Sequence, residues 1–164
     1  MAEPVIERIA DQYARTLRSV TEASGYTLTL EQVYRAFRNQ NIAVDLPYAC
    51  VLTEGEDGEE ADPLLHWKCL ARFSVYVFIL ADGADPDLAD TLTNRAVSDV
   101  KRAILSEPAL QGGQVAGTLV DRTLYEGFDR ALFGDGTSWV HGAEVRFLTT
   151  YVHHETDPRR GSGE

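Results

Sequence analysis

An apolar alternation from Leu64 to Leu80 constrains the fold of this chain more than any other feature. Every second residue from Leu65 to Ile79 is apolar, and the intervening positions are polar at first and apolar toward the end. Side chains of a strand alternate between its two faces. The pattern therefore predicts a strand with one face buried throughout and the other buried only near its end.

The same stretch is too short and too charged for a membrane-spanning helix. As a helix it would reach about 26 Å, less than the roughly 30 Å of a hydrocarbon layer, with Lys68 and Arg72 inside it. Its β-branched and aromatic residues favour the pleated conformation. As an unbroken strand it would span about 55 Å, which is longer than a small domain needs.

Composition and charge narrow the function classes. The chain has 164 residues, 44% of them apolar and 25% charged, as expected for one globular domain. We see no secretion leader, so a secreted protein is not expected. The net charge of −11 argues against a nucleic-acid binder and against a partner of anionic membranes. Cys50 and Cys69 lack metal-ligand spacing and are predicted to be reduced strand residues.

Hydrophobic periodicity and turn signals predict two helices and five strands. The helices are expected at 4–24 and 86–106, and the strands at 32–37, 46–53, 64–80, 118–126 and 138–154. The fold class is α+β: a mainly antiparallel β-sheet with two amphipathic helices packed on one face. We expect a single domain over 1–155 and a flexible tail over 156–164. The other sheet face and the long edges would need a partner subunit as cover.

An acidic segment separates two of the predicted strands. Residues 54–62, EGEDGEEAD, carry six carboxylates in nine positions. Like charges at this density are typical of a solvated, extended loop. The segment lacks the ligand spacing of a calcium loop. The sequence therefore predicts an exposed acidic loop between the two strands.

No arrangement of residues in the sequence predicts catalysis, a cofactor or a metal. The candidate metal ligands considered are His153, His154 and Glu155, with His66 or His141 as distant helpers. Adjacent strand residues point to opposite faces, however, so a solvated strand end is the better interpretation. No nucleophile, base and orienting residue stand in a recognisable context. An enzyme or small-ligand domain stays an alternative, which a closed pocket with converging polar side chains would support.

Five segments in order carry a resemblance to a known family. They are SGYTL at 24–28, VYR at 33–35, a proline, apolar strand and acidic unit at 46–60, VSDVKRAILSEPALQGG at 97–113, and GAEVRFLTTYVHHETDP at 142–158. With these segments the chain resembles the tail terminator, or tail completion, proteins of long-tailed bacteriophages, the lambda U-like group. The resemblance lies in the order of the helices and strands and extends over nearly the whole chain. It includes no catalytic signature.

The resemblance implies a structural virion protein, assembled in the host cytoplasm, at the neck on top of the tail. Such a protein forms a homo-oligomeric ring, expected to be a hexamer, that caps the tail tube, ends its polymerisation and joins the tail to the head connector. The implied partners are the tail-tube protein and the head-tail connector or stopper protein. DNA would pass through without specific binding, and no membrane is involved. A head-tail stopper or a tail-tube subunit is the alternative.

Under this resemblance the acidic loop is a candidate lumen-facing or partner-facing surface. Its candidate residues are Glu54, Glu56, Asp57, Glu59 and Glu60. Carboxylates in a lumen would repel phosphate and let DNA slide. Plain solubility is the alternative explanation for the acidic surplus.

Overall fold

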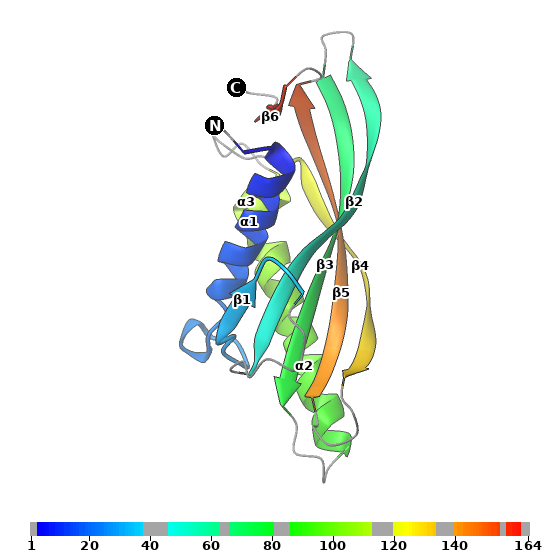
Figure 1. Cartoon of the computed structure of the whole chain (residues 1–164). Coiled ribbons are helices and arrows are strands. Elements are labelled where there is room, and N and C mark those ends of the chain that lie inside the picture. The colour runs from blue at the N-terminus through cyan, green and yellow to red at the C-terminus, as the bar shows by residue number, and fades with distance from the viewer. Residues whose placement is uncertain are drawn as a thin grey trace.

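The computed structural model describes residues 3–37, 46–62, 66–80, 86–112, 120–133, 140–154 and 157–161. Its elements are α1 (Val5–Arg18), the 3-10 helix η1 (Glu22–Ser24), β1 (Gln32–Tyr34), β2 (Tyr48–Asp62), β3 (His66–Leu80), α2 (Pro86–Ser106), α3 (Pro108–Gln111), β4 (Arg122–Phe133), β5 (Val140–His154) and β6 (Asp157–Gly161). Figure 1 shows these elements as a helix layer beside one twisted sheet.

The sheet has the strand order β1-β2-β3-β5-β4, and β6 pairs with β5 beyond the end of β4. Only β1 and β2 run parallel, and the other neighbours are antiparallel. Helices α1 and α2 cover one face, and the described residues place no helix on the other (Figure 1). The predicted α+β class is therefore confirmed. We call the uncovered side the helix-free face.

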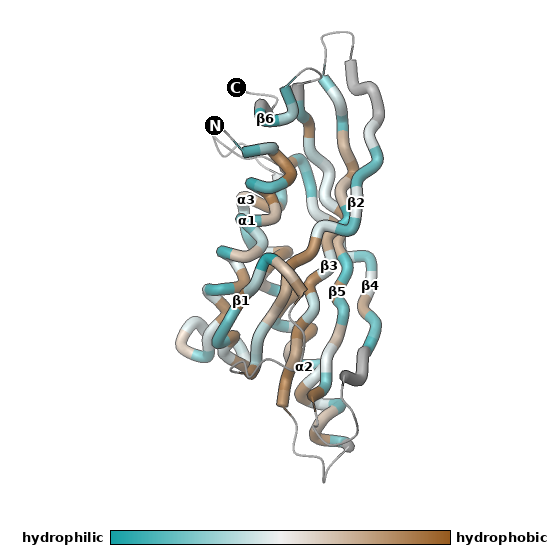
Figure 2. The backbone as a smooth tube through the Cα atoms, in the orientation of Figure 1, coloured by the Kyte–Doolittle hydropathy of each residue, from teal (hydrophilic) through white to brown (hydrophobic). Residues whose placement is uncertain are grey.

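The main core lies between the helices and the alternating residues of β3 and β5. Phe73, Val75 and Val77 are 1%, 0% and 1% exposed, which confirms the predicted buried face of the long strand. They pack in one cluster with apolar residues of both helices, among them Ile9 and Val100. Figure 2 shows that hydrophobic residues dominate the part of β3 nearest α2, whereas much of β4 is hydrophilic.

A smaller aromatic cluster occupies the helix-free face at the end of β3. Tyr48, Cys50 and Phe78 are buried there, with Tyr34 and Tyr76 packed against them. The rings of Tyr48 and Phe78 stack at 4.6 Å between centroids. Burial raises the pKa of Tyr48 to about 12. This cluster explains why the second register of the long strand becomes apolar only near its end.

Two β-bulges lie at nearly the same level of the sheet. Glu54 of β2 and Glu126 of β4 are the extra residues, since the pairing register shifts across each of them. The following glycines, Gly55 and Gly127, have φ of 156° and 142°, a backbone region that side chains with a Cβ rarely adopt. Bulges bend a strand and increase its twist. They account for the strong twist at the middle of the sheet (Figure 1).

Several predicted boundaries are wrong. The acidic segment 54–62 is not a loop, because β2 runs through it to Asp62 and pairs with β3. Strand β4 runs to Phe133 through residues expected to separate two strands. The first helix ends at Arg18, and η1 follows. In the predicted tail, residues 157–161 form β6, and Arg8 donates a hydrogen bond to the Arg159 carbonyl.

Candidate interaction surfaces

The strand register brings three leucines to neighbouring positions on the helix-free face, near the middle of the sheet. Leu124 of β4 pairs with Leu148 of β5, and Leu148 in turn pairs with Arg72 of β3. Leu70 stands two residues from Arg72 on the same face, within reach of Leu148 across the strand pair. Leu124 is 39% exposed, and the other two leucines are half-buried. We call Leu70, Leu124 and Leu148 the leucine patch.

Ion pairs on the helix-free face flank the leucine patch. Arg72 Nη2 lies 2.6 Å from Asp57 Oδ2 on one side of it. On the other side Arg146 pairs with Asp129 and lies 3.8 Å from Glu144. Exposed ion pairs of this kind add little to stability. Charged pairs around apolar side chains are the usual composition of a subunit contact.

The structure places the predicted acidic residues along β2. Glu54 is the exposed extra residue of the bulge. After the bulge, Glu56 pairs with Ala71 on the helix side and Asp57 with Leu70 on the helix-free side. The backbones of Glu59 and Glu60 pair with Lys68 and Trp67 of β3. The five residues therefore share a strand, where the sequence predicted a flexible loop.

Glu56 has a structural role as well as a charge. Tyr151 is 2% exposed, and its hydroxyl donates a hydrogen bond to the Glu56 carboxylate. Burial, reinforced by this carboxylate, raises the pKa of the Tyr151 hydroxyl. Burial also raises the pKa of the neighbouring Cys69 thiol. The Cys69 thiol is thus held protonated, and Cys50 and Cys69 both lie buried on strands, as predicted.

Removing the Tyr151 hydroxyl tests whether the acidic segment is part of the fold. We expect Tyr151→Phe to lower the free energy of unfolding by about 1–2 kcal/mol, because Glu56 loses a buried donor. Urea denaturation measures this. Tyr26→Phe is the control, since it also removes one tyrosine hydroxyl. The Tyr26 ring keeps its contact with the Arg102 guanidinium, whose Cζ lies 4.0 Å from the ring centroid. Equal stability of wild type and Tyr151→Phe would contradict a structural role for Glu56.

The structure does not gather the candidate metal-ligand histidines in one place. The backbones of His66 and His154 pair at one end of β5, beside His153, whereas His141 pairs with Ile79 at the other end. Across the described ranges, no three His, Cys, Asp or Glu residues are grouped so that they could hold a metal ion. Glu155 lies outside the described residues. Within those residues, no helix combines the length and apolar character that crossing a membrane requires.

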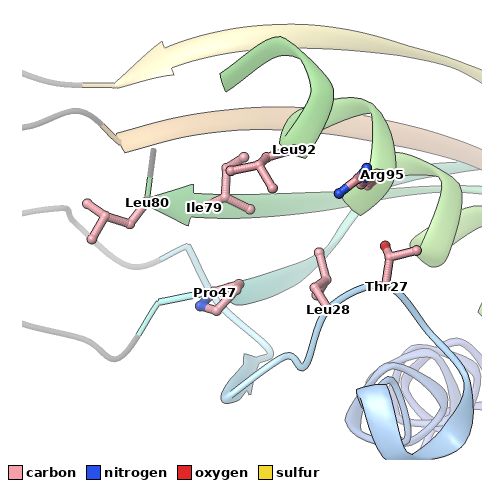
Figure 3. A pocket seen from close by; sticks show the side chains of 7 residues that line it. All are labelled: Thr27, Leu28, Pro47, Ile79, Leu80, Leu92 and Arg95. Atoms are coloured by element: carbon pink, nitrogen blue, oxygen red, sulfur yellow. The ribbon is translucent and has the colours of Figure 1, made fainter. Parts of the chain in front are cut away.

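A small pocket lies at the end of β3, beside α2 (Figure 3). Its lining consists of Thr27, Leu28, Pro47, Ile79, Leu80, Leu92 and Arg95. Its volume is about 90 Å³, well below the roughly 300–1,000 Å³ of typical ligand pockets. The lining is mostly apolar, and its polar groups do not form a catalytic set. The pocket therefore does not support the small-ligand alternative.

Comparison with known proteins includes a distant structural neighbour. No family model and no curated protein matches the chain. Among solved structures, the chain is similar to a chain of the virion of a native gene transfer agent (GTA) particle. The identity is 16%, the TM-score is 0.49, and the match covers 88% of this chain and 92% of that chain. At this TM-score the likeness carries no argument about function.

Proposed function

We propose that the chain is a structural virion subunit that closes into a ring on the tail tube, ends its polymerisation and joins the tail to the head connector. The observation that carries this proposal is the leucine patch on the helix-free face. Leu124 is 39% exposed there, on strands of 12 and 15 residues that the helices cover from one side only. Exposed apolar side chains on long strands favour a partner subunit.

In the proposed ring, the leucine patch of one copy contacts a different surface of the next copy. A contact between unlike surfaces of neighbouring copies is heterologous, and it closes when the rotation between copies permits. Such a closed ring, taken as sixfold, agrees with the assembly that the sequence resemblance implies.

The acidic strand segment then takes one of two places in the ring. Toward the lumen, Glu54 and its neighbours would repel DNA phosphates and let the duplex pass. Toward the tube, they would present negative charge to a partner protein. Plain solubility is the alternative explanation of the charge. In either place the segment acts through electrostatics and not through catalysis.

Electron microscopy of the purified protein, alone and mixed with tail-tube protein, tests this function. Closed rings alone, and tubes of defined length capped by rings in the mixture, are expected. Open stacks of the chain alone would favour a tail-tube subunit instead. A monomer that neither forms rings nor alters tube growth at any concentration would contradict the proposal.

Charging the leucine patch should prevent assembly without unfolding the subunit. We expect Leu124→Lys to shift the protein from rings to monomers, because a desolvated lysine in a subunit contact is strongly unfavourable. Light scattering after size-exclusion chromatography measures the mass. The matched control is Leu105→Lys on α2, where the leucine is 36% exposed on the helix layer. If both variants retain rings, the leucine patch is not the subunit contact.

A further inference from the structure

Strand β2 has one edge that no described strand pairs over most of its length. Strand β1 pairs only with Tyr48–Cys50. From Val51 to Asp62, β3 lies on one side of β2 and no described element lies on the other (Figure 1). Residues 51–62 contain no proline, so every backbone N–H there is a donor. An edge of this kind can accept an added strand.

The charge on this edge excludes a second copy of the same edge. Pairing two β2 segments would place carboxylates opposite carboxylates, which destabilises a strand pair. The other long edge of the sheet, β4, is balanced: Arg122 and Arg130 are offset by Glu126 and Asp129. Arg130 already binds Asp90 and Asn94 of α2. Neither edge of a second copy is therefore complementary to β2.

A glycine brings an aromatic ring close to this edge. A Cβ on Gly58 would lie 3.3 Å from Cε3 of Trp67, so the indole packs directly over the position where a side chain would stand. Trp67 is only half-buried. An incoming strand would pass beside this ring. Lysine and arginine bind the face of tryptophan through cation–π attraction.

We propose that the edge of β2 from Gly55 to Asp62 binds an extended, Lys/Arg-rich segment of a partner protein as an additional β-strand. Backbone hydrogen bonds supply the pairing. The carboxylates on both faces of the edge select a basic segment, and Trp67 adds a cation–π contact. The inference deepens the proposed function. It rests on that function only in one respect, the expectation that the partner is a neighbouring virion protein.

A synthetic peptide of about eight residues, the length of the Gly55–Asp62 edge, serves as the probe. Pairs of lysines alternate with pairs of threonines, so both faces of the peptide carry positive charge. The control peptide has the same side chains and a fully N-methylated backbone, which cannot donate hydrogen bonds. Fluorescence anisotropy with full-length protein measures binding. Amide hydrogen exchange locates it on the chain.

The inference expects the unmodified peptide to bind and to protect amides of residues 55–62 from exchange, while the methylated peptide binds at least about tenfold more weakly. Equal binding of both peptides would show charge attraction without strand pairing and would overturn the inference. So would the absence of binding, or protection confined to another strand.

A charge variant tests the selection of a basic partner. Changing Glu54, Glu59 and Glu60 together to Gln removes three charges and leaves Glu56 and Asp57 with their partners Tyr151 and Arg72. We expect about tenfold weaker peptide binding, since each cross-strand charge pair contributes modestly. The matched control neutralises three carboxylates outside β2, all of them exposed: Glu22→Gln, Glu31→Gln and Glu126→Gln. Equal losses of peptide binding in the two variants would show that only the net charge of the protein matters. That result would overturn the selection of a basic partner by this edge.

Ring formation and strand binding fail separately. The peptide assay is repeated on the Leu124→Lys variant, whose edge is unchanged. Rings in the wild type without peptide protection would overturn the inference and leave the proposed function intact. Peptide binding to a protein that never forms rings would support the edge and contradict the proposed function.

Discussion

Phe73→Ala is expected to lower the free energy of unfolding by about 3–5 kcal/mol. Phe73 is 1% exposed at the centre of β3. Its ring stacks on Tyr13 of α1, with 4.8 Å between the centroids and 22° between the planes. Phe147, opposite it on β5, meets the same Tyr13 ring edge-on at 5.9 Å. Truncation would leave a cavity at the contact that joins α1 to the sheet.

Urea denaturation with linear extrapolation measures this loss. Phe37→Ala is the matched control, because the same truncation is made at a ring that is 44% exposed, and a much smaller loss is expected there. If Phe73→Ala does not fold, Phe73→Leu retains more of the volume and is expected to lose less stability than Phe73→Ala. Equal losses for Phe73→Ala and Phe37→Ala would place the core elsewhere.

Periodicity predicted the core well, because burial of one strand face produces a regular alternation of apolar residues in the sequence. The alternation from Leu65 to Ile79 identified β3 and its buried face, including Phe73. The second helix was predicted with the bounds that α2 has, since a proline begins it and another stops it. The α+β class follows from two such helices and one set of alternating strands.

The acidic strand segment was missed because its composition opposes the strand conformation. Glycine and carboxylates have low β-propensity, so residues 54–62 were predicted as a loop. A signal was nevertheless present. The buried face of β3 begins near Trp67, and a strand of that length needs an equally long neighbour to satisfy its backbone. Asp62-Pro63 is a turn sequence between the two. Tertiary pairing with β3 thus outweighs local preference.

The leucine patch could not be predicted, because a bulge decides which face each residue of β4 takes. Read with strict alternation, Leu124 and Phe128 lie on one face. The extra residue Glu126 shifts the register, so Phe128 packs in the main core while Leu124 stays on the helix-free face. A one-residue slip reverses every later side chain. Neither bulge has an unambiguous sequence signal, so the exposed surface was not visible in the sequence.

Asp99 of α2 makes a contact that no sequence pattern indicated. The residue is 4% exposed. One of its carboxylate oxygens, Oδ2, accepts three hydrogen bonds. The donors are the Thr27 amide at 2.7 Å, the Thr27 hydroxyl at 2.6 Å and the Leu28 amide at 3.2 Å. These bonds fasten the segment after η1 to the second helix. The carboxylate thus replaces backbone partners that this segment lacks.

Asp99→Ala should therefore lower the free energy of unfolding by about 2–4 kcal/mol, because two backbone amides and a hydroxyl lose a charged acceptor where water has little access. Asp99→Asn is expected to lose less, since a single amide oxygen in the position of Oδ2 can still accept all three bonds without the charge. Asp90→Ala on the same helix removes an exposed partner of Arg130 and of Asn94 and should have a much smaller effect. Hydrogen exchange at the Thr27 and Leu28 amides, compared with urea denaturation, separates loosening of this segment from global unfolding. A stable Asp99→Ala protein with both amides still protected would show that the contact is dispensable.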